Sequence, residues 1–303
     1  MIKPRFLRFF RHLNFKTLKQ VATNVGKQRL LGLSSEIAYN AMLSLFPGIL
    51  AILTAIGLLE QSLQNIFNEL AQQLSEIAPQ EVLDLISEFA RNEIASSKNG
   101  GLFSVSFIAA LWTSSGAIST VMGALDQIQQ TSLDKIRPFW QAKLVSLGLT
   151  IGTIILLLIA CILIFISGEL LQFVVDNSGG YLNFLSHLWN LMRYPLALII
   201  VASAFAFIYR YGPSRWKKGT PIMPGAIFAA ICWAFVSNLF RIYVANFGNY
   251  NKAYGAIGTV IVLMLWLYMT AAVILIGNQL NVTVGKNMYP NSFKKIEADG
   301  NLN

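Results

Sequence analysis

The chain has 303 residues, of which 55% are hydrophobic and only 12% are charged. A soluble domain needs roughly twice this share of charged residues to cover its surface, and disordered or coiled-coil chains are more polar still. The composition therefore predicts an integral membrane protein. The net charge of +9 has to be explained by where the basic residues lie.

Residues 1–36 form a basic N-terminal segment, which we expect on the cytoplasmic side. The segment carries eight Lys and Arg residues, and phenylalanine and leucine residues alternate with these cations over residues 1–20. This pattern is typical of an amphipathic helix that lies along the membrane surface and contacts anionic headgroups. An arm that binds a protein partner is the alternative.

Six stretches with few or no charged residues are candidates for membrane-spanning helices. A helix needs about 20 apolar residues to cross the hydrocarbon core. The candidate stretches are 37–59, 102–121, 144–167, 191–209, 223–243 and 256–280. The fourth stretch is the shortest, and it spans if Arg193 and Arg210 extend toward the two interfaces. The sequence therefore predicts an all-α bundle of six membrane-spanning helices within residues 37–286.

The segment between the first two spans, about residues 60–101, is predicted to lie outside the membrane. Its apolar residues follow helical spacing on both sides of Pro79, which suits the first position of a helix. We expect two short amphipathic helices that fold as an external hairpin over the outer end of the bundle. After the last span, residues 287–303 are expected to form a cytoplasmic tail without ordered structure.

The basic residues predict the orientation of the chain in the membrane. Eighteen of the 23 Lys and Arg residues lie in the N-terminal segment, the second-to-third connection, the fourth-to-fifth connection and the tail. With six spans, these four regions share one side of the membrane. The positive-inside rule then places both termini in the cytoplasm. Orientation accounts for the basic charge, so nucleic-acid binding is not required.

Polar residues within the spans are the candidate functional site, because such groups are costly in hydrocarbon. Glu36, Asn40 and Ser44 are spaced four residues apart on one helix face. Pro47 follows them and cannot donate to the backbone carbonyl of Leu43, which is freed nearby. The other candidates lie in the second, fifth and sixth spans: Thr113, Ser114, Ser115, Asn238, Arg241 and Gln279. If these faces converge, they line a polar cleft. Ordinary hydrogen bonding between helices is the alternative for each of them.

No catalytic motif accompanies these polar residues in the sequence. The chain has two histidines, far apart, and it lacks the zinc-protease, serine-hydrolase, P-loop and Cys-x-x-Cys motifs. Metal-dependent hydrolysis of RNA would need clustered histidine and aspartate. We therefore expect no catalytic residues, no cofactor and no metal ion.

Seven short motifs follow one another along the chain. They are AYNAMLSLFP at 38–47, LWTSSG at 111–116, RPFW at 137–140, PGA at 224–226, YG at 254–255, LWLY at 265–268 and GNQLN at 277–281. In this order and spacing they resemble the YihY/BrkB family of bacterial inner-membrane proteins, over residues 20–285. The resemblance implies six helices in the inner membrane and no established activity. Members once carried a ribonuclease label, which these residues do not support.

Two positions depart from the family pattern. Where the family usually has Ala-Glu after the glycine of the last motif, this chain has Asn278 and Gln279. A proton-coupling role for that carboxylate is therefore not transferred. Near Asp126 the family commonly has asparagine, so we expect different local hydrogen bonding.

The leading functional hypothesis is translocation of a lipid or amphipathic envelope compound through a polar cleft between helices. It rests on the clustered polar faces and on the absence of catalytic motifs. The alternative is a non-transporting scaffold that holds an envelope protein through the external hairpin, and a membrane-embedded enzyme is the third hypothesis. Membrane lipids are the expected partners.

Overall fold

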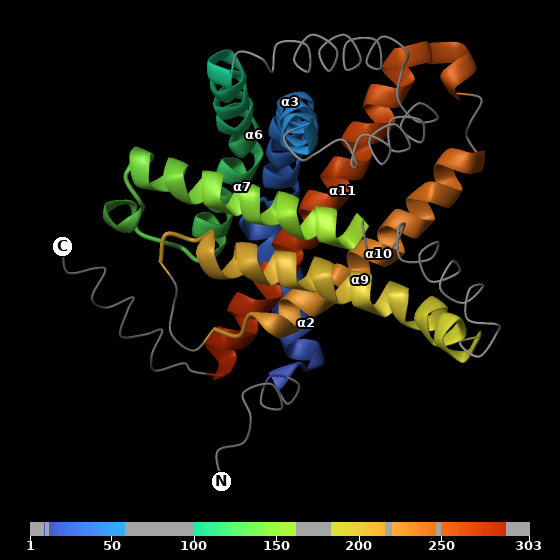
Figure 1. The fold of residues 1–303 in the computed structure, drawn as a ribbon. Coiled ribbons are helices and arrows are strands. Elements are labelled where there is room, and N and C mark those ends of the chain that lie inside the picture. Colours follow the sequence, from blue (N-terminus) through green and yellow to red (C-terminus); the bar gives the residue numbers. More distant parts are fainter. Residues whose placement is uncertain are drawn as a thin grey trace.

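The computed structural model describes residues 9, 12–57, 100–161, 183–215, 220–246 and 250–288. Within these ranges the secondary structure is helical and no strand occurs (Figure 1). The α-helices are α2 (Phe15–Lys27), α3 (Leu30–Gly57), α6 (Gly100–Ile128), α7 (Phe139–Cys161), α9 (Asn183–Tyr211), α10 (Met223–Asn246) and α11 (Tyr250–Met288). A short 3-10 turn, η2 (Leu133–Lys135), precedes α7. The prediction of an all-α fold is confirmed.

Five helices of the described ranges are long and apolar enough to cross a membrane. Their apolar windows are Ile108–Ile128, Phe139–Leu156, Tyr194–Tyr211, Met223–Val244 and Val260–Met288. These windows correspond to the second to sixth predicted spans. The first predicted span falls on α3 and continues into residues outside the described ranges, so the count of six stays a prediction. Nearly all of the predicted external hairpin and the tail after Met288 also lie outside the described residues.

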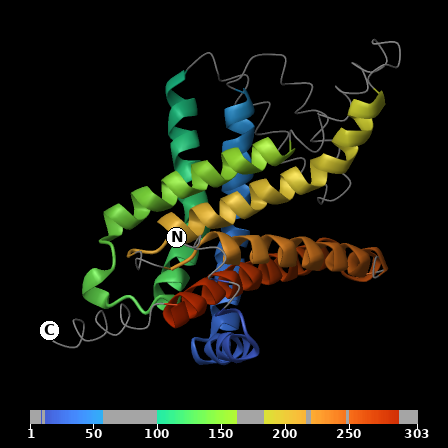
Figure 2. The same cartoon turned by 90° about the horizontal axis from the view of Figure 1, so that it is seen from below.

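The helices pack in chain order into a closed ring. Each of α3, α6, α7, α9 and α10 packs on the helix that follows it in this order, and α11 returns to contact α3. α11 also contacts α6 across the ring, and α2 packs on α11 and α3. In Figure 2, α7 lies beside α9 and α10 lies beside α11, while α3 and α6 form a separate pair. The first and last predicted spans are therefore neighbours.

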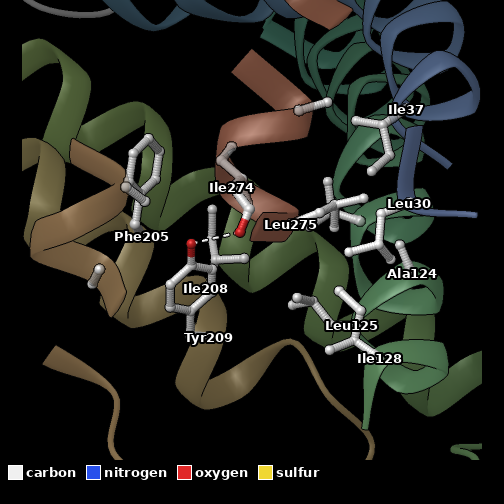
Figure 3. Packing of buried hydrophobic residues seen from close by; sticks show 14 of the residues in the cluster. Leu30, Ile37, Ala124, Leu125, Ile128, Phe205, Ile208, Tyr209, Ile274 and Leu275 are labelled. Atoms are coloured by element: carbon white, nitrogen blue, oxygen red, sulfur yellow. Dashed lines mark hydrogen bonds between the residues drawn. The ribbon is translucent and has the colours of Figure 1, made fainter. Parts of the chain in front are cut away.

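The apolar core lies where α3, α6, α9, α10 and α11 meet. Leu30 of α3, Leu125 of α6 and Leu275 of α11 are fully buried and belong to one cluster, shown in Figure 3. Tyr209 of α9 is also fully buried, and its hydroxyl donates a hydrogen bond of 2.6 Å to the carbonyl oxygen of Ile274. A buried tyrosine usually finds such a partner for its hydroxyl group.

The crossing of α10 and α11 is built on two glycines. A Cβ atom placed on Gly225 would overlap Asn281 and the carbonyl oxygen of Gly277. A Cβ atom placed on Gly277 would lie 2.6 Å from the Tyr209 hydroxyl oxygen and 2.7 Å from Cβ of Ala229. Small residues at a crossing let two membrane helices approach closely. Neither position has room for a side chain.

Three helices continue past the predicted spans at one end of the bundle. α3 begins at Leu30, seven residues before the predicted span, and α6 ends at Ile128, seven residues after it. α11 ends at Met288, eight residues after the last predicted span. At 1.5 Å per residue, each extension adds roughly 10 Å. In α6 and α11 the extensions belong to the same apolar windows, which run to Ile128 and Met288.

The four basic regions of the sequence meet at this same end. The Gln127 side chain of α6 donates to the carbonyl oxygen of Gln28, which follows α2. Lys286 of α11 donates to Gln130 in the connection after α6. The Asn287 side chain donates to Thr17 and Gln20 of α2. The connection after α9 also lies at this end, through its contacts with Asp126 described below. We call this region the basic end. Its composition is what the positive-inside pattern predicts for the cytoplasmic side.

The helix α2 packs on the bundle, and most of residues 1–11 of the predicted N-terminal helix lie outside the described residues. α2 begins at Phe15, and the Asn14 side chain caps it by accepting a hydrogen bond from the Thr17 backbone amide. Val21 is buried in a cluster with Leu280 and Val284 of α11. One face of the helix is therefore occupied by protein, while Phe15 and Leu18 on the other side are exposed.

Candidate functional site

The structure brings Ser44 together with residues 113–115 and places the other candidates apart from them. Ser44 of α3 lies against the middle of α6, where Thr113, Ser114 and Ser115 are located. Pro47 is half-buried one turn further along α3. Ser114 is buried, and its hydroxyl donates within α6 to the carbonyl oxygen of Leu111 at 3.1 Å.

Ser44 occupies a position within the backbone hydrogen bonding of α6. Its buried hydroxyl donates to the carbonyl oxygen of Thr113 at 3.4 Å and accepts from the backbone amide of Ala117 at 3.2 Å. In a regular α-helix these two backbone groups would bond to each other. A side chain that inserts in this way is a recognised cause of bending in helices. Ser44 therefore joins α3 to the backbone of α6.

Lys143 brings α7 to the same part of α6. Its ammonium group donates to the carbonyl oxygen of Trp112 at 2.8 Å and to the Ser115 hydroxyl at 2.6 Å. The ammonium nitrogen also lies 4.5 Å from the centroid of the Trp112 ring, which is a cation–π contact. Among the described residues, no carboxylate forms an ion pair with Lys143. Ser44, Thr113, Ser115 and Lys143 together are the polar node of this bundle.

Sequence reasoning missed Lys143, because its charge was treated as the boundary of the third apolar stretch. The residue lies four positions after the start of α7, inside the apolar window Phe139–Leu156. A charged residue within such a window is a candidate functional group in its own right. The position of Lys143 inside an apolar stretch was therefore the feature of the sequence that could have identified it.

Glu36 and Asn40 precede Ser44 on α3 and lie nearer the basic end. Glu36 is exposed, and within the described part of the chain its carboxylate has no hydrogen-bond or ion-pair partner. The Asn40 side chain donates to the backbone carbonyl of Glu36 at 3.0 Å. Glu36, Asn40 and Ser44 lie on one face of α3. Of these three residues, Ser44 forms hydrogen bonds to another helix.

The remaining candidates belong to separate places. Arg241 donates to Asn238 at 3.0 Å, and both are exposed toward the C-terminal end of α10. Gln279 is buried in α11 and donates to Thr283 at 3.0 Å, while its side-chain oxygen has no hydrogen-bond partner among the described residues. We infer that these three residues are not part of the polar node.

A second polar cluster, centred on Asp126, lies at the basic end. Asp126 is buried, and its two carboxylate oxygens accept hydrogen bonds from the Ser214 backbone amide at 2.7 Å and the Ser214 hydroxyl at 2.6 Å. The Ser214 hydroxyl also accepts from the Arg137 backbone amide, and the Arg137 guanidinium donates to the carbonyl oxygen of Gly212 at 2.8 Å. This cluster joins the connection after α6 to the connection after α9.

Asn281 of α11 fixes the beginning of α10. Its side-chain oxygen accepts from the Gly225 amide at 2.8 Å, and its side-chain nitrogen donates to the carbonyl oxygen of Ile222 at 2.9 Å. The first amides of a helix have no partner within the helix, so a side chain from another element can satisfy them. The motifs at 224–226 and 277–281 thus contact each other. Sequence reasoning quoted both motifs without predicting this contact.

The described residues contain no group of three or more His, Cys, Asp or Glu side chains that could hold a metal ion. Lys143 in the polar node hydrogen-bonds to another helix, and Asp126 hydrogen-bonds to the connection after α9. These contacts are suited to binding polar groups and to holding the helices in register.

Comparison with known proteins gives a consistent result over most of the chain. The family model described as virulence factor BrkB matches residues 21–300. The ribonuclease-like protein YfkH of Bacillus subtilis is 32% identical, over 84% of this chain and 89% of its own length. A UPF0761 membrane protein of Verminephrobacter eiseniae is 26% identical, over 87% of this chain and 61% of its own length. A UPF0761 membrane protein of Tolumonas auensis is 24% identical, over 86% of this chain and 83% of its own length. No solved structure matches.

Proposed function

Because this chain belongs to the virulence factor BrkB family, whose relatives include UPF0761 membrane proteins, we propose that it translocates a lipid or an amphipathic envelope compound across the bacterial inner membrane. The family membership confirms the resemblance read from the seven motifs. The proposal itself is carried by one observation, the polar node between α3, α6 and α7.

The polar node supports translocation for a physical reason. A polar headgroup that enters hydrocarbon loses its hydration, and this loss is the main barrier to its crossing. The node offers hydroxyl groups, two backbone groups of α6 that contact the Ser44 hydroxyl, and an ammonium group that forms no ion pair with a carboxylate in the described part of the chain. Such groups replace part of the lost hydration. The exposed surface of Trp112 shows that the node lies close to the outside of the bundle.

Reconstitution into liposomes tests the proposal directly. We expect vesicles that contain the protein and a fluorescent phospholipid analogue to lose the fluorescence of both leaflets when a membrane-impermeant reductant is added outside. Empty vesicles should lose only the fluorescence of the outer leaflet. Equal loss in protein-containing and empty vesicles, across anionic and zwitterionic analogues, would contradict translocation of phospholipids.

Replacing Lys143 with glutamine is expected to reduce the initial rate of translocation by about tenfold or more. A hydrogen bond from a charged donor contributes about 1.5–3 kcal/mol, and 1.4 kcal/mol corresponds to a factor of ten. The rate of fluorescence loss in liposomes measures the effect. Lys135→Gln is the matched control. It removes the same charge in the connection before α7, where the Lys135 side chain makes no hydrogen bond to the described part of α6.

A third variant asks whether the node or the Glu36 face carries the activity. Glu36→Gln should leave the rate and the melting temperature in detergent unchanged, because the Glu36 carboxylate has no partner in the described part of the chain. A loss of translocation in Glu36→Gln, or equal losses in Lys143→Gln and Lys135→Gln, would contradict the assignment of the site to the polar node.

We further propose that the basic end faces the cytoplasm, with both termini on that side. Cysteine labelling in a variant without Cys161 and Cys232 tests this orientation. In spheroplasts, an impermeant maleimide should label Ser97→Cys in the 60–101 segment and should leave Ser132→Cys in the connection after α6 unlabelled until the membrane is permeabilised. Labelling of Ser132→Cys in intact spheroplasts would reverse the orientation.

The ribonuclease label in the name of YfkH is not part of our proposal for this chain. Metal-dependent RNA hydrolysis needs a cluster of ligands, and the described residues contain no group that could hold a metal ion. The scaffold alternative depends on residues 60–101, which lie almost wholly outside the described ranges, so it stays a prediction from the sequence.

A further inference from the structure

Lys143 contacts the ring of Trp112, which belongs to a cluster of three aromatic side chains at the surface formed by α6 and α7. The rings of Trp112 and Trp140 have centroids 6.2 Å apart, and the rings of Phe139 and Trp140 are 5.4 Å apart. Phe139 and Trp140 are 67% and 68% exposed, so this aromatic cluster faces the surroundings of the bundle. Tryptophan side chains are enriched where membrane lipid headgroups meet acyl chains, because the ring is apolar and its N–H is polar.

The ammonium group of Lys143 retains binding capacity within this surface. An ammonium group has three N–H donors. Within the described part of the chain, Lys143 uses two of them, toward the Trp112 carbonyl oxygen and the Ser115 hydroxyl. Both acceptors are neutral, and no described carboxylate forms an ion pair with Lys143. Its positive charge therefore remains uncompensated beside an apolar span. An anion placed there would gain a charge-assisted hydrogen bond.

Exposed apolar residues continue from the aromatic cluster along both helices. Leu144 of α7 is 68% exposed and Ile108 of α6 is 62% exposed. A ligand for this surface thus needs an anionic group next to a long apolar part. Anionic phospholipids have this chemistry, and the membrane presents them at high local concentration.

We propose that Lys143 binds the phosphate group of an anionic phospholipid at the α6–α7 surface, beside the exposed rings of Trp112 and Trp140. Lysine is a common phosphate ligand that acts as a point charge. The buried Ser115 hydroxyl, which donates to the Trp112 carbonyl oxygen and accepts from Lys143, holds the ammonium group in place. A zwitterionic lipid is disfavoured, because its own ammonium group would approach Lys143. The inference rests on the proposed function for its biological use, since it names the substrate class that the polar node would receive. The binding itself can be measured without translocation.

The test is a competition between lipids for the full-length protein in a neutral detergent. The protein is incubated with equal amounts of phosphatidylglycerol and phosphatidylcholine, and the bound lipids are counted by native mass spectrometry. We expect the wild-type protein to retain phosphatidylglycerol in preference to phosphatidylcholine. Lys143→Gln should lower phosphatidylglycerol occupancy by about tenfold, as loss of a charge-assisted hydrogen bond implies.

Two further variants separate the site from general charge and from folding defects. Lys143→Arg should keep the preference, because it keeps the charge. Lys135→Gln should also keep it, because the Lys135 side chain makes no hydrogen bond to the described part of α6. Equal losses in Lys143→Gln and Lys135→Gln would overturn the proposal, as would equal retention of both lipids by the wild type. If Lys143→Gln does not fold, Lys143→Arg decides: a lost preference for phosphatidylglycerol in this variant, which keeps the positive charge, would overturn the site.

An additional competition experiment distinguishes a lipid phosphate group from free inorganic phosphate. Inorganic phosphate should not displace phosphatidylglycerol at equal concentration, because it lacks the acyl chains that the apolar surface binds; displacement would show a site for free phosphate and would overturn the lipid assignment. The lipid site and the proposed function can fail independently. If Lys143→Gln loses lipid binding and still translocates, the lipid site stands and the role of the node in translocation is wrong. If it loses translocation and keeps lipid binding, the lipid site is wrong.

Discussion

Replacing Gly277 with alanine is expected to destabilise the protein by about 3 kcal/mol. The new methyl group would lie 2.6 Å from the Tyr209 hydroxyl oxygen and 2.7 Å from Cβ of Ala229, and overpacking of a close contact costs about 1–3 kcal/mol. Tyr209 would also have to move away from the carbonyl oxygen of Ile274, its hydrogen-bond acceptor. Losing a buried hydrogen bond adds about 1–3 kcal/mol. The melting temperature in detergent, followed by circular dichroism, measures the effect.

The matched control for Gly277→Ala is Gly123→Ala in α6. A Cβ atom on Gly123 would lie more than 4 Å from any side chain or other helix of the described residues, so no clash opposes the substitution. Alanine is favoured over glycine within a helix by about 0.5–1 kcal/mol, and Gly123→Ala should therefore leave the melting temperature unchanged or raise it. Equal melting temperatures for Gly277→Ala and the wild type would show that α10 and α11 do not cross as closely as described.

Replacing Asp126 with alanine is expected to cost about 3 kcal/mol of stability. The change removes the acceptor of two short hydrogen bonds from Ser214, and hydrogen bonds to charged groups contribute about 1.5–3 kcal/mol. The Ser214 amide would then have no acceptor in a partly buried position. Thermal unfolding in detergent measures the loss. Asp134→Asn is the control, because Asp134 lies exposed in the same connection and bonds only to Ser132 among the described residues.

Asp126→Asn should fall between the wild type and the alanine variant. The asparagine keeps one acceptor oxygen for the Ser214 amide, while its nitrogen donates where the Ser214 hydroxyl donates at present. The Ser214 hydroxyl can rotate, and it already accepts from the Arg137 amide. We expect a cost of about 1 kcal/mol for this exchange. An alanine variant as stable as the wild type would contradict the role of Asp126 in joining the two connections.

The helical class and the positions of the later spans follow from a one-dimensional pattern. Long apolar stretches between charges must form helices in a membrane, because backbone groups have no other partners there. The same reasoning set the helix ends too early at the basic end. The charge of Asp126 set the limit of the second predicted span. A charged side chain does not end a helix when hydrogen bonds satisfy it, as those from Ser214 do here, and α6 continues to Ile128.

Contacts between distant segments were beyond the reach of this pattern. The spacing of Glu36, Asn40 and Ser44 correctly places them on one face of α3, but spacing carries no information on which helix that face meets. Only the packed structure shows that Ser44 bonds to the backbone of α6. Lys143 and Asp126 were treated as charges that mark the limits of spans. Their actual partners, Ser115 and Ser214, are 28 and 88 residues away.

The closed ring has a consequence for how the protein is made. Ribosomes synthesise α2 early and α11 last, yet the buried face of α2 packs on Leu280 and Val284 at the end of α11. Throughout nearly all of translation, Val21 and its neighbours lack their final intramolecular partner, and the gap between α3 and α10 stays open. Insertion of α11 closes the ring and covers α2 in a single late event. A nascent chain that stalls before α11 emerges would present both apolar surfaces to whatever binds incomplete membrane proteins.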